Sequence, residues 1–224
     1  MQCSMGFHTH VMSSQPTVII LAEPDAEPAR SSDGAAVPLG PFDTLGTLLR
    51  KVVSAEWPVL LVAPPGPAQA ALSLLPQKDI LVAPEPPALH PPGDWLVRAM
   101  AAGVMTRSLS PGWVIVPGDM PMLQVDTLHV LARNLVRAPI LYPSHRHVRG
   151  QPVALASELY SELIRLDSEA DLRRLTARYP AQDIEVDDPG IHMGSATLGA
   201  LDQWRAQVGG PLAPTLRRPV RHFN

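Results

Sequence analysis

The chain has 224 residues, 46% of them hydrophobic and 17% charged, which is enough for one large α/β domain with a sizeable core. A net charge of -3 argues against a general nucleic-acid binder, which would be basic, and no apolar run reaches the roughly 18 residues of a membrane span. The single cysteine, Cys3, excludes an internal disulfide framework, and the N-terminus lacks a signal-peptide pattern, so we expect a cytoplasmic protein.

The first half of the chain predicts strands that alternate with helices. Short buried runs of aliphatic residues predict strands at 17–22, 58–63, 79–83, 113–116 and 139–142. One-sided apolar patterns predict helices at 42–55, 67–75, 95–106 and 125–136. Prolines and glycines predict loops at 23–40 and 84–92. The alternation predicts a mainly parallel sheet with helices on both faces.

The second half continues this pattern less regularly. We expect strands at 151–156 and 183–186, and helices at 157–166, 171–179 and 197–207. The resulting organisation is a disordered leader over 1–15, a single domain over 16–207, and a basic, poorly ordered tail over 208–224.

A single carboxylate follows the fourth predicted strand, within Gly118-Asp119-Met120-Pro121. In open α/β sheets, ligands bind at the carboxyl ends of the strands. A carboxylate there suits a hard cation such as Mg²⁺, and Mg²⁺ there suits a nucleotide. The alternative is that Asp119 is an N-cap or turn residue before the next helix, and the residues alone leave both open.

Two arginines, Arg146 and Arg149, lie in the loop 144–152 after the fifth strand. Arginine matches phosphate oxygens in a bidentate geometry, so this loop is a candidate for binding an anionic substrate. The alternative is a solvated basic loop with no ligand.

Two further features allow both a functional and a structural interpretation. Asp187 and Asp188 precede Pro-Gly at a strand end, where they could serve a metal or form a plain turn. Gly103 lies among small residues of a predicted helix, which would let a base ring approach or would permit tight packing of the helix on the sheet.

Taken in order, these segments resemble the MobA-like nucleotidyltransferases, the molybdenum cofactor guanylyl- and cytidylyltransferases, over about residues 17–205. Residues 118–121 match the family's Gly-Asp-Met/Gln-Pro turn, and 149–152 match its Arg-Gly-His-Pro segment. Residues 186–190 match its acidic strand end, and 38–40 match its Pro-Leu-Gly segment. The cytidylyltransferase-like branch is the most similar.

The resemblance implies a three-layer αβα sandwich with a mixed, mostly parallel sheet, of the nucleotide-diphospho-sugar-transferase or Rossmann-like kind. It implies transfer of a nucleoside monophosphate from an NTP, CTP or GTP, to molybdopterin with release of pyrophosphate and with Mg²⁺ as cofactor. A molybdoenzyme or a maturation protein is then an expected partner. The implied site comprises Asp119 as catalytic residue and metal ligand, Asp188 as second metal ligand, Leu21, Ala22, Arg30, Gly103 and Gly118 at the nucleotide, and Arg146, Arg149 and Gln151 at the acceptor substrate.

The phosphate-binding loop departs from the family pattern. The family carries a glycine-rich loop whose backbone N–H groups reach the triphosphate, and a lysine follows this loop. Here the segment 21–30 has two prolines, which lack that N–H, and three acidic residues, Glu23, Asp25 and Glu27. Like charges about 5 Å apart repel by about 1–3 kcal/mol, so this segment opposes a polyanion. The two lysines of the chain, Lys51 and Lys78, lie outside the loop.

Other family positions are also changed. Gly194 and Ala196 stand where the family has acids that help to hold Mg²⁺, and Gln151 replaces the usual histidine. These losses support an alternative function, a catalytically degenerate homologue that binds a cofactor or a partner protein without transferring a nucleotide. A sugar-phosphate nucleotidyltransferase is a third interpretation, with weaker support from the second half of the chain.

Overall fold

The computed structural model describes residues 15–22, 44–83 and 92–193. Arg30, nearly all of the predicted leader, the loop 23–40, the helix 197–207 and the tail 208–224 lie outside the described residues. No helix within the described ranges is long and apolar enough to cross a membrane.

The described elements follow the predicted alternation. The strands are β1 (Thr17–Leu21), β2 (Val59–Ala63), β3 (Ile80–Val82), β4 (Gly112–Pro117), β5 (Ile140–His145), β6 (Val148–Arg149), β7 (Val153–Ala156) and β8 (Ala181–Glu185). The α-helices are α1 (Thr44–Ser54), α2 (Pro65–Ala71), α3 (Pro92–Thr106), α4 (Val125–Asn134), α5 (Tyr160–Leu163) and α6 (Glu169–Arg178). Short 3₁₀ helices are η1 (Gln77–Asp79), η2 (Ser157–Leu159) and η3 (Pro189–His192).

The predicted boundaries differ from the observed ones where local chemistry sets the start of a helix. Helix α2 begins at Pro65, because proline is tolerated in the first turn of a helix. Helix α6 begins two residues before its predicted start, because Ser168 and Asp171 form a capping box. The predicted helix 157–166 is divided between η2 and α5.

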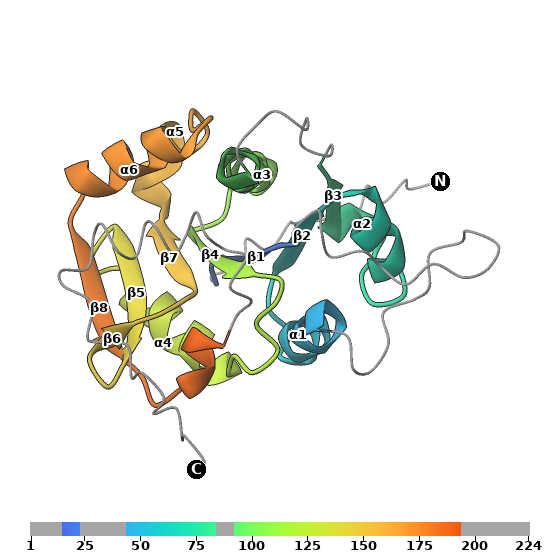
Figure 1. The fold of residues 1–224 in the computed structure, drawn as a ribbon, viewed down its shortest axis with the longest axis horizontal. Helices are drawn as coiled ribbons and strands as arrows, with labels where there is room; N and C mark the ends of the chain where they lie inside the picture. The colour runs from blue at the N-terminus through green and yellow to red at the C-terminus, as the bar shows by residue number, and fades with distance from the viewer. Residues whose placement is uncertain (1–14, 23–43, 84–91, 194–224) are drawn as a thin grey trace, which may run out of the picture.

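The strands form one mixed sheet in the order β3-β2-β1-β4-β7-β5-β6, with β8 paired to β5 (Figure 1). Strands β1 to β4 are parallel to one another, and β8 is parallel to β5. Strand β7 runs antiparallel to both β4 and β5. The prediction of a mixed, mostly parallel sheet is therefore confirmed.

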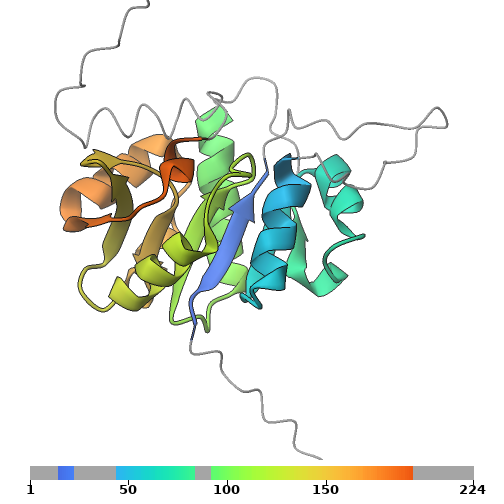
Figure 2. The same cartoon turned by 90° about the horizontal axis from the view of Figure 1, so that it is seen from below.

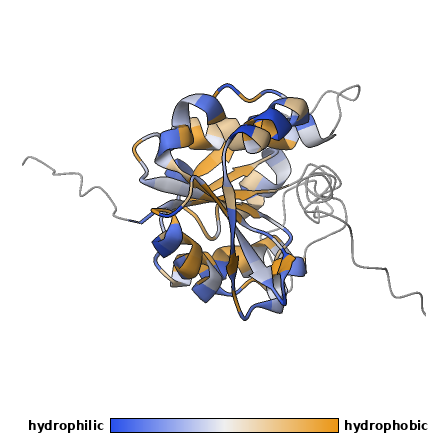
Figure 3. Cartoon of the chain, turned by 90° about the vertical axis from the view of Figure 1, so that its left-hand side faces the viewer, coloured by the Kyte–Doolittle hydropathy of each residue, from blue (hydrophilic) through white to orange (hydrophobic). Residues whose placement is uncertain are grey.

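Helices cover both faces of the sheet and make three layers (Figures 1 and 3). Alternate residues of β1 point to opposite faces, so Val18 and Ile20 pack with α1, α2 and α4, while Ile19 and Leu21 pack with α3 and α6. Hydrophobic residues gather between the helices and the sheet in Figure 3. This is the predicted three-layer αβα sandwich.

The carboxyl ends of the parallel strands meet at one edge of the sheet, which we call the carboxyl edge. The last residues of β1 and β4, Leu21 and Pro117, are paired in register. Strand β1 points toward the edge at which η3 lies in Figure 2. Because β7 is antiparallel, its first residue, Val153, starts at this edge. The segments that follow β4, β5 and β8 therefore converge there.

Candidate functional site

The ends of β1 and β4 touch through Gly118. The backbone N–H of Gly118 donates to the carbonyl oxygen of Leu21 at 2.8 Å. A Cβ at this position would lie 3.0 Å from that oxygen and 3.2 Å from the Cα of Ala22, closer than side chains normally allow. The close approach thus favours glycine here, because a side chain would push these neighbours by a few tenths of an ångström, and Asp119 follows directly. The structure brings together four predicted site residues, Leu21, Ala22, Gly118 and Asp119.

Asp119 is half-buried, with its Oδ1 atom out of contact with solvent. The loop after it is fastened by Met120 and Leu123, both buried in the core. Lys51, on α1, donates from its Nζ to the carbonyl oxygens of Pro121 at 2.6 Å and Leu123 at 3.3 Å. The sequence did not indicate this role for Lys51, because the contact joins residues about 70 positions apart.

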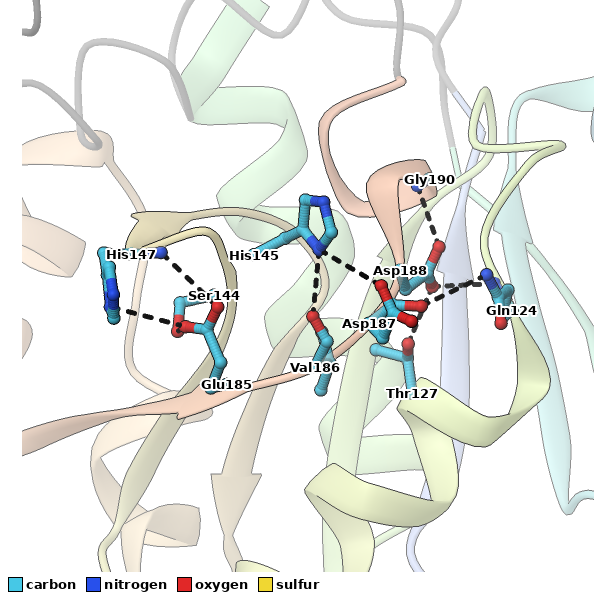
Figure 4. A network of polar contacts seen from close by, with 10 residues as sticks. All are labelled: Gln124, Thr127, Ser144, His145, His147, Glu185, Val186, Asp187, Asp188 and Gly190. Carbon is cyan, nitrogen blue, oxygen red and sulfur yellow. Dashed lines mark hydrogen bonds and ion pairs between the residues drawn. The ribbon is translucent and has the colours of Figure 1, made fainter.

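Asp188 connects the end of β8 to the start of α4 (Figure 4). The residue is 2% exposed. One oxygen accepts from the backbone N–H of Gln124 at 2.9 Å and from the Thr127 hydroxyl at 2.7 Å, and the other accepts from the N–H of Gly190 at 2.8 Å. These contacts match the turn interpretation of Asp188, and they hold the loop that carries Asp119. The metal role of Asp188 stays a prediction.

His145 stands beside Asp187, which is fully exposed. The Nδ1 atom of His145 lies 3.1 Å from the carbonyl oxygen of Val186 and 3.9 Å from an oxygen of Asp187 (Figure 4). The rings of His145 and His192 are 6.4 Å apart. Nevertheless, in the part of the chain that the structure describes, no group of three or more His, Cys, Asp or Glu side chains is arranged to hold a metal ion.

The hairpin between β5 and β6 carries the first predicted arginine. Arg146 is exposed at its tip, where both Arg146 and His147 have positive φ, 53° and 63°. Beside the tip, Ser144 donates to Glu185 at 2.7 Å, and this hydrogen bond lowers the pKa of Glu185. No ion pair of the Arg146 side chain is found among the described residues, and its role in substrate binding stays a prediction.

Arg149 is held within the fold. Its Nε donates to Asp183 at 2.6 Å, and its guanidinium lies 4.4 Å from the centre of the Tyr142 ring. Burial raises the pKa of Tyr142 well above its usual range, so the phenol stays neutral under the cationic group. The charge of Arg149 is therefore already balanced, while its role in substrate binding stays a prediction.

Gln151 is 2% exposed and lies next to η3. Its backbone N–H donates to the carbonyl oxygen of Ile191 at 3.0 Å. Its side-chain Oε1 is buried and has no hydrogen-bond partner among the described residues. Gln151 is therefore a buried acceptor at the carboxyl edge, which makes it a candidate for ligand contact.

Gly103 lies where α3 crosses the sheet. A Cβ on it would lie 3.0 Å from Ile19 and 3.1 Å from Val62, so the glycine lets the helix pack closely. These contacts favour the packing alternative. A place for Gly103 at the nucleotide base stays a prediction.

A mostly parallel sheet with a carboxylate and backbone contacts at its carboxyl edge defines an α/β domain of the ligand-binding, Rossmann-like class. The sequence profile of the MobA-like NTP transferase domain matches residues 30–184. The chain belongs to this family, as its motifs predicted. No curated protein was found to match it in sequence.

Several solved structures share the fold. A homologue of Mycobacterium tuberculosis Rv0371c from Mycobacterium sp. strain JC1 has a TM-score of 0.62 at 19% identity, over 87% of this chain and 97% of that one. Rv0371c of M. tuberculosis H37Rv in complex with manganese has a TM-score of 0.58 at 22% identity, over 84% of this chain and 97% of that one. A CMP:2-keto-3-deoxy-manno-octonic acid synthetase in complex with CTP has a TM-score of 0.55 at 14% identity, over 86% of this chain and 98% of that one.

Proposed function

We propose that this chain transfers a nucleoside monophosphate from CTP or GTP to molybdopterin or another phosphorylated acceptor, with release of pyrophosphate, in the cytoplasm. Membership of the MobA-like NTP transferase family supports nucleotidyl transfer. The observation that carries the proposal is the close contact between Gly118 and the end of β1, which sets Asp119 at the carboxyl edge. Rv0371c was solved with manganese and a synthetase of the same fold with CTP, which supports a metal and a nucleotide here.

In this proposal Asp119 holds the divalent cation. Mg²⁺ needs only one or two protein carboxylates when phosphate oxygens and waters complete its shell, and a half-buried carboxylate fits that requirement. When bound, the ion offsets phosphate charge and polarises the reacting phosphoryl group. The backbone at Leu21, Ala22 and Gly118 would face the nucleotide, and Arg146 would bind the acceptor's phosphate.

The catalytically degenerate homologue is the second candidate. Lys51 is bonded to loop carbonyls and Arg149 is paired with Asp183, so neither cation is freely available to a triphosphate. The acidic residues at 23, 25 and 27 add to the same argument. This candidate would bind an acceptor or a partner protein and would show no nucleotide-dependent stabilisation.

The test measures pyrophosphate from each NTP with molybdopterin and Mg²⁺ or Mn²⁺. Asp119→Asn should lower release by roughly 100-fold or more, because it removes the cation ligand. Asp126→Asn is the matched control, since Asp126 is an exposed carboxylate in the first turn of α4. No release with any nucleotide, together with no thermal shift by CTP and Mn²⁺, would establish the degenerate homologue instead.

A further inference from the structure

An apolar cavity lies between α3, α6 and the face of the sheet formed by β4 and β7. Its walls are mainly aliphatic, and four polar or charged side chains join them. The lining residues that the argument uses are Leu21, Val97, Met100, Pro117, Gln151 and Thr176.

The cavity reaches the carboxyl edge. Leu21 and Pro117 are the last residues of β1 and β4, and Gln151 lies two residues before β7. Helices α3 and α6 both start at this edge, where Asp94 accepts a hydrogen bond from the backbone N–H of Glu169 at 2.9 Å. Asp119 follows Pro117 by two residues, so the cavity adjoins the proposed transfer site.

Among the described residues, one buried polar side-chain atom of the lining lacks a hydrogen-bond partner. The Thr176 hydroxyl donates to the carbonyl oxygen of Leu172 at 3.1 Å, and a guanidinium nitrogen of Arg173 lies 3.9 Å from a carboxylate oxygen of Glu169. In contrast, the buried Oε1 of Gln151 accepts no hydrogen bond from any described residue. Leaving a buried acceptor unpaired costs about 1–3 kcal/mol, so a ligand that donates one hydrogen bond here would gain affinity.

We propose that this cavity binds a small apolar group that carries a single O–H or N–H donor, with Gln151 Oε1 as the acceptor. The assignment of this group to the acceptor substrate rests on the proposed function, whereas the binding itself does not. A nucleobase or a pterin has several polar edge groups, and these walls would leave most of them unpaired. If the cavity holds one end of the acceptor in the proposed transfer, its apolar walls favour the other kind of phosphorylated acceptor, one with a mainly apolar end, over molybdopterin.

Phenol and toluene are suitable probes, because they differ by one hydroxyl. With ¹³C-methyl methionine labelling, the Met100 methyl reports the cavity, while Met122, 58% exposed and outside its lining, reports nonspecific binding. We expect phenol to shift the NMR resonance of the Met100 methyl group and to bind roughly 3- to 10-fold more tightly than toluene. Gln151→Leu should bring this ratio to about 1 by removing the acceptor. Gln69→Leu, at an exposed position on α2, should leave it unchanged.

Val97→Phe fills the cavity and should abolish the changes that phenol and toluene cause in the NMR resonance of the Met100 methyl group. If that variant fails to fold, judged by circular dichroism, Gln151→Leu decides alone. A Met100 methyl that neither probe moves, or a phenol preference that persists in Gln151→Leu, would overturn the proposal. Phenol binding with neither pyrophosphate release nor a thermal shift by CTP and Mn²⁺ would leave the cavity site standing and refute the transferase, and release without phenol binding would do the reverse.

Discussion

Replacing Asp188 with alanine should strongly destabilise the fold, because three donors lose their acceptor together. Hydrogen bonds to a charged group contribute about 1.5–3 kcal/mol each, and part of this offsets the cost of burying the carboxylate. We therefore expect the free energy of unfolding to fall by about 3–5 kcal/mol. For a chain of this size, that corresponds to a Tm lower by roughly 6–20 °C.

Asp187→Ala is the matched control. Asp187 is fully exposed, and its contact with His145 spans 3.9 Å, so its loss should change stability by no more than about 0.5 kcal/mol. Asp188→Asn keeps one carbonyl acceptor, so its free energy of unfolding should lie between those of Asp188→Ala and Asp187→Ala. Urea unfolding followed by circular dichroism measures all three. An Asp188→Ala variant within about 1 kcal/mol of wild type, or no less stable than Asp187→Ala, would refute this account.

Three further predictions concern other contacts. Arg149→Ala should lower stability by roughly 1–2 kcal/mol through its lost carboxylate and ring contacts, whereas Arg146→Ala should leave stability unchanged and weaken phosphate binding, both measurable by thermal shift. Asp119→Asn should abolish the Tm increase that CTP with Mn²⁺ gives, and an increase that persists would contradict its role as metal ligand. Hydrogen bonding by Ser168 lowers the pKa of Asp171, so this stabilisation is present above the ordinary Asp pKa and is lost as pH falls through the lowered value. Ser168→Ala should lower Tm by roughly 2–4 °C at neutral pH and flatten that part of the acid-unfolding curve.

The sequence predicted the features that depend on local pattern. The buried run before Gly118 indicated a strand, and the strand–helix alternation indicated the parallel sheet that sets Asp119 at the carboxyl edge. It could not resolve the role of Asp188, because the Thr127 hydroxyl that bonds it is 61 residues away. The partner of Arg149, Asp183, is likewise 34 residues away. Such pairs follow from strand order, which residue types alone do not specify.

Lys51 tests whether a cation near the site serves the fold or the phosphates. It is half-buried on α1, and its Nζ already donates to the carbonyls of Pro121 and Leu123. If it supports this loop, Lys51→Met should lower stability by about 1–2 kcal/mol, or roughly 2–8 °C in Tm. The additional Tm shift caused by CTP with Mn²⁺ should persist.

A phosphate-binding lysine would give the opposite result, with an unchanged Tm of the free protein and a lost nucleotide shift. Lys78→Met is the control, since Lys78 lies in η1 just before β3, at the amino ends of the parallel strands and thus opposite the carboxyl edge. If Lys51 serves the loop, the charge of a bound triphosphate would instead be offset by the divalent cation that we propose at Asp119. Nucleotide binding should then depend strongly on the divalent ion, and CTP should give no Tm shift in its absence.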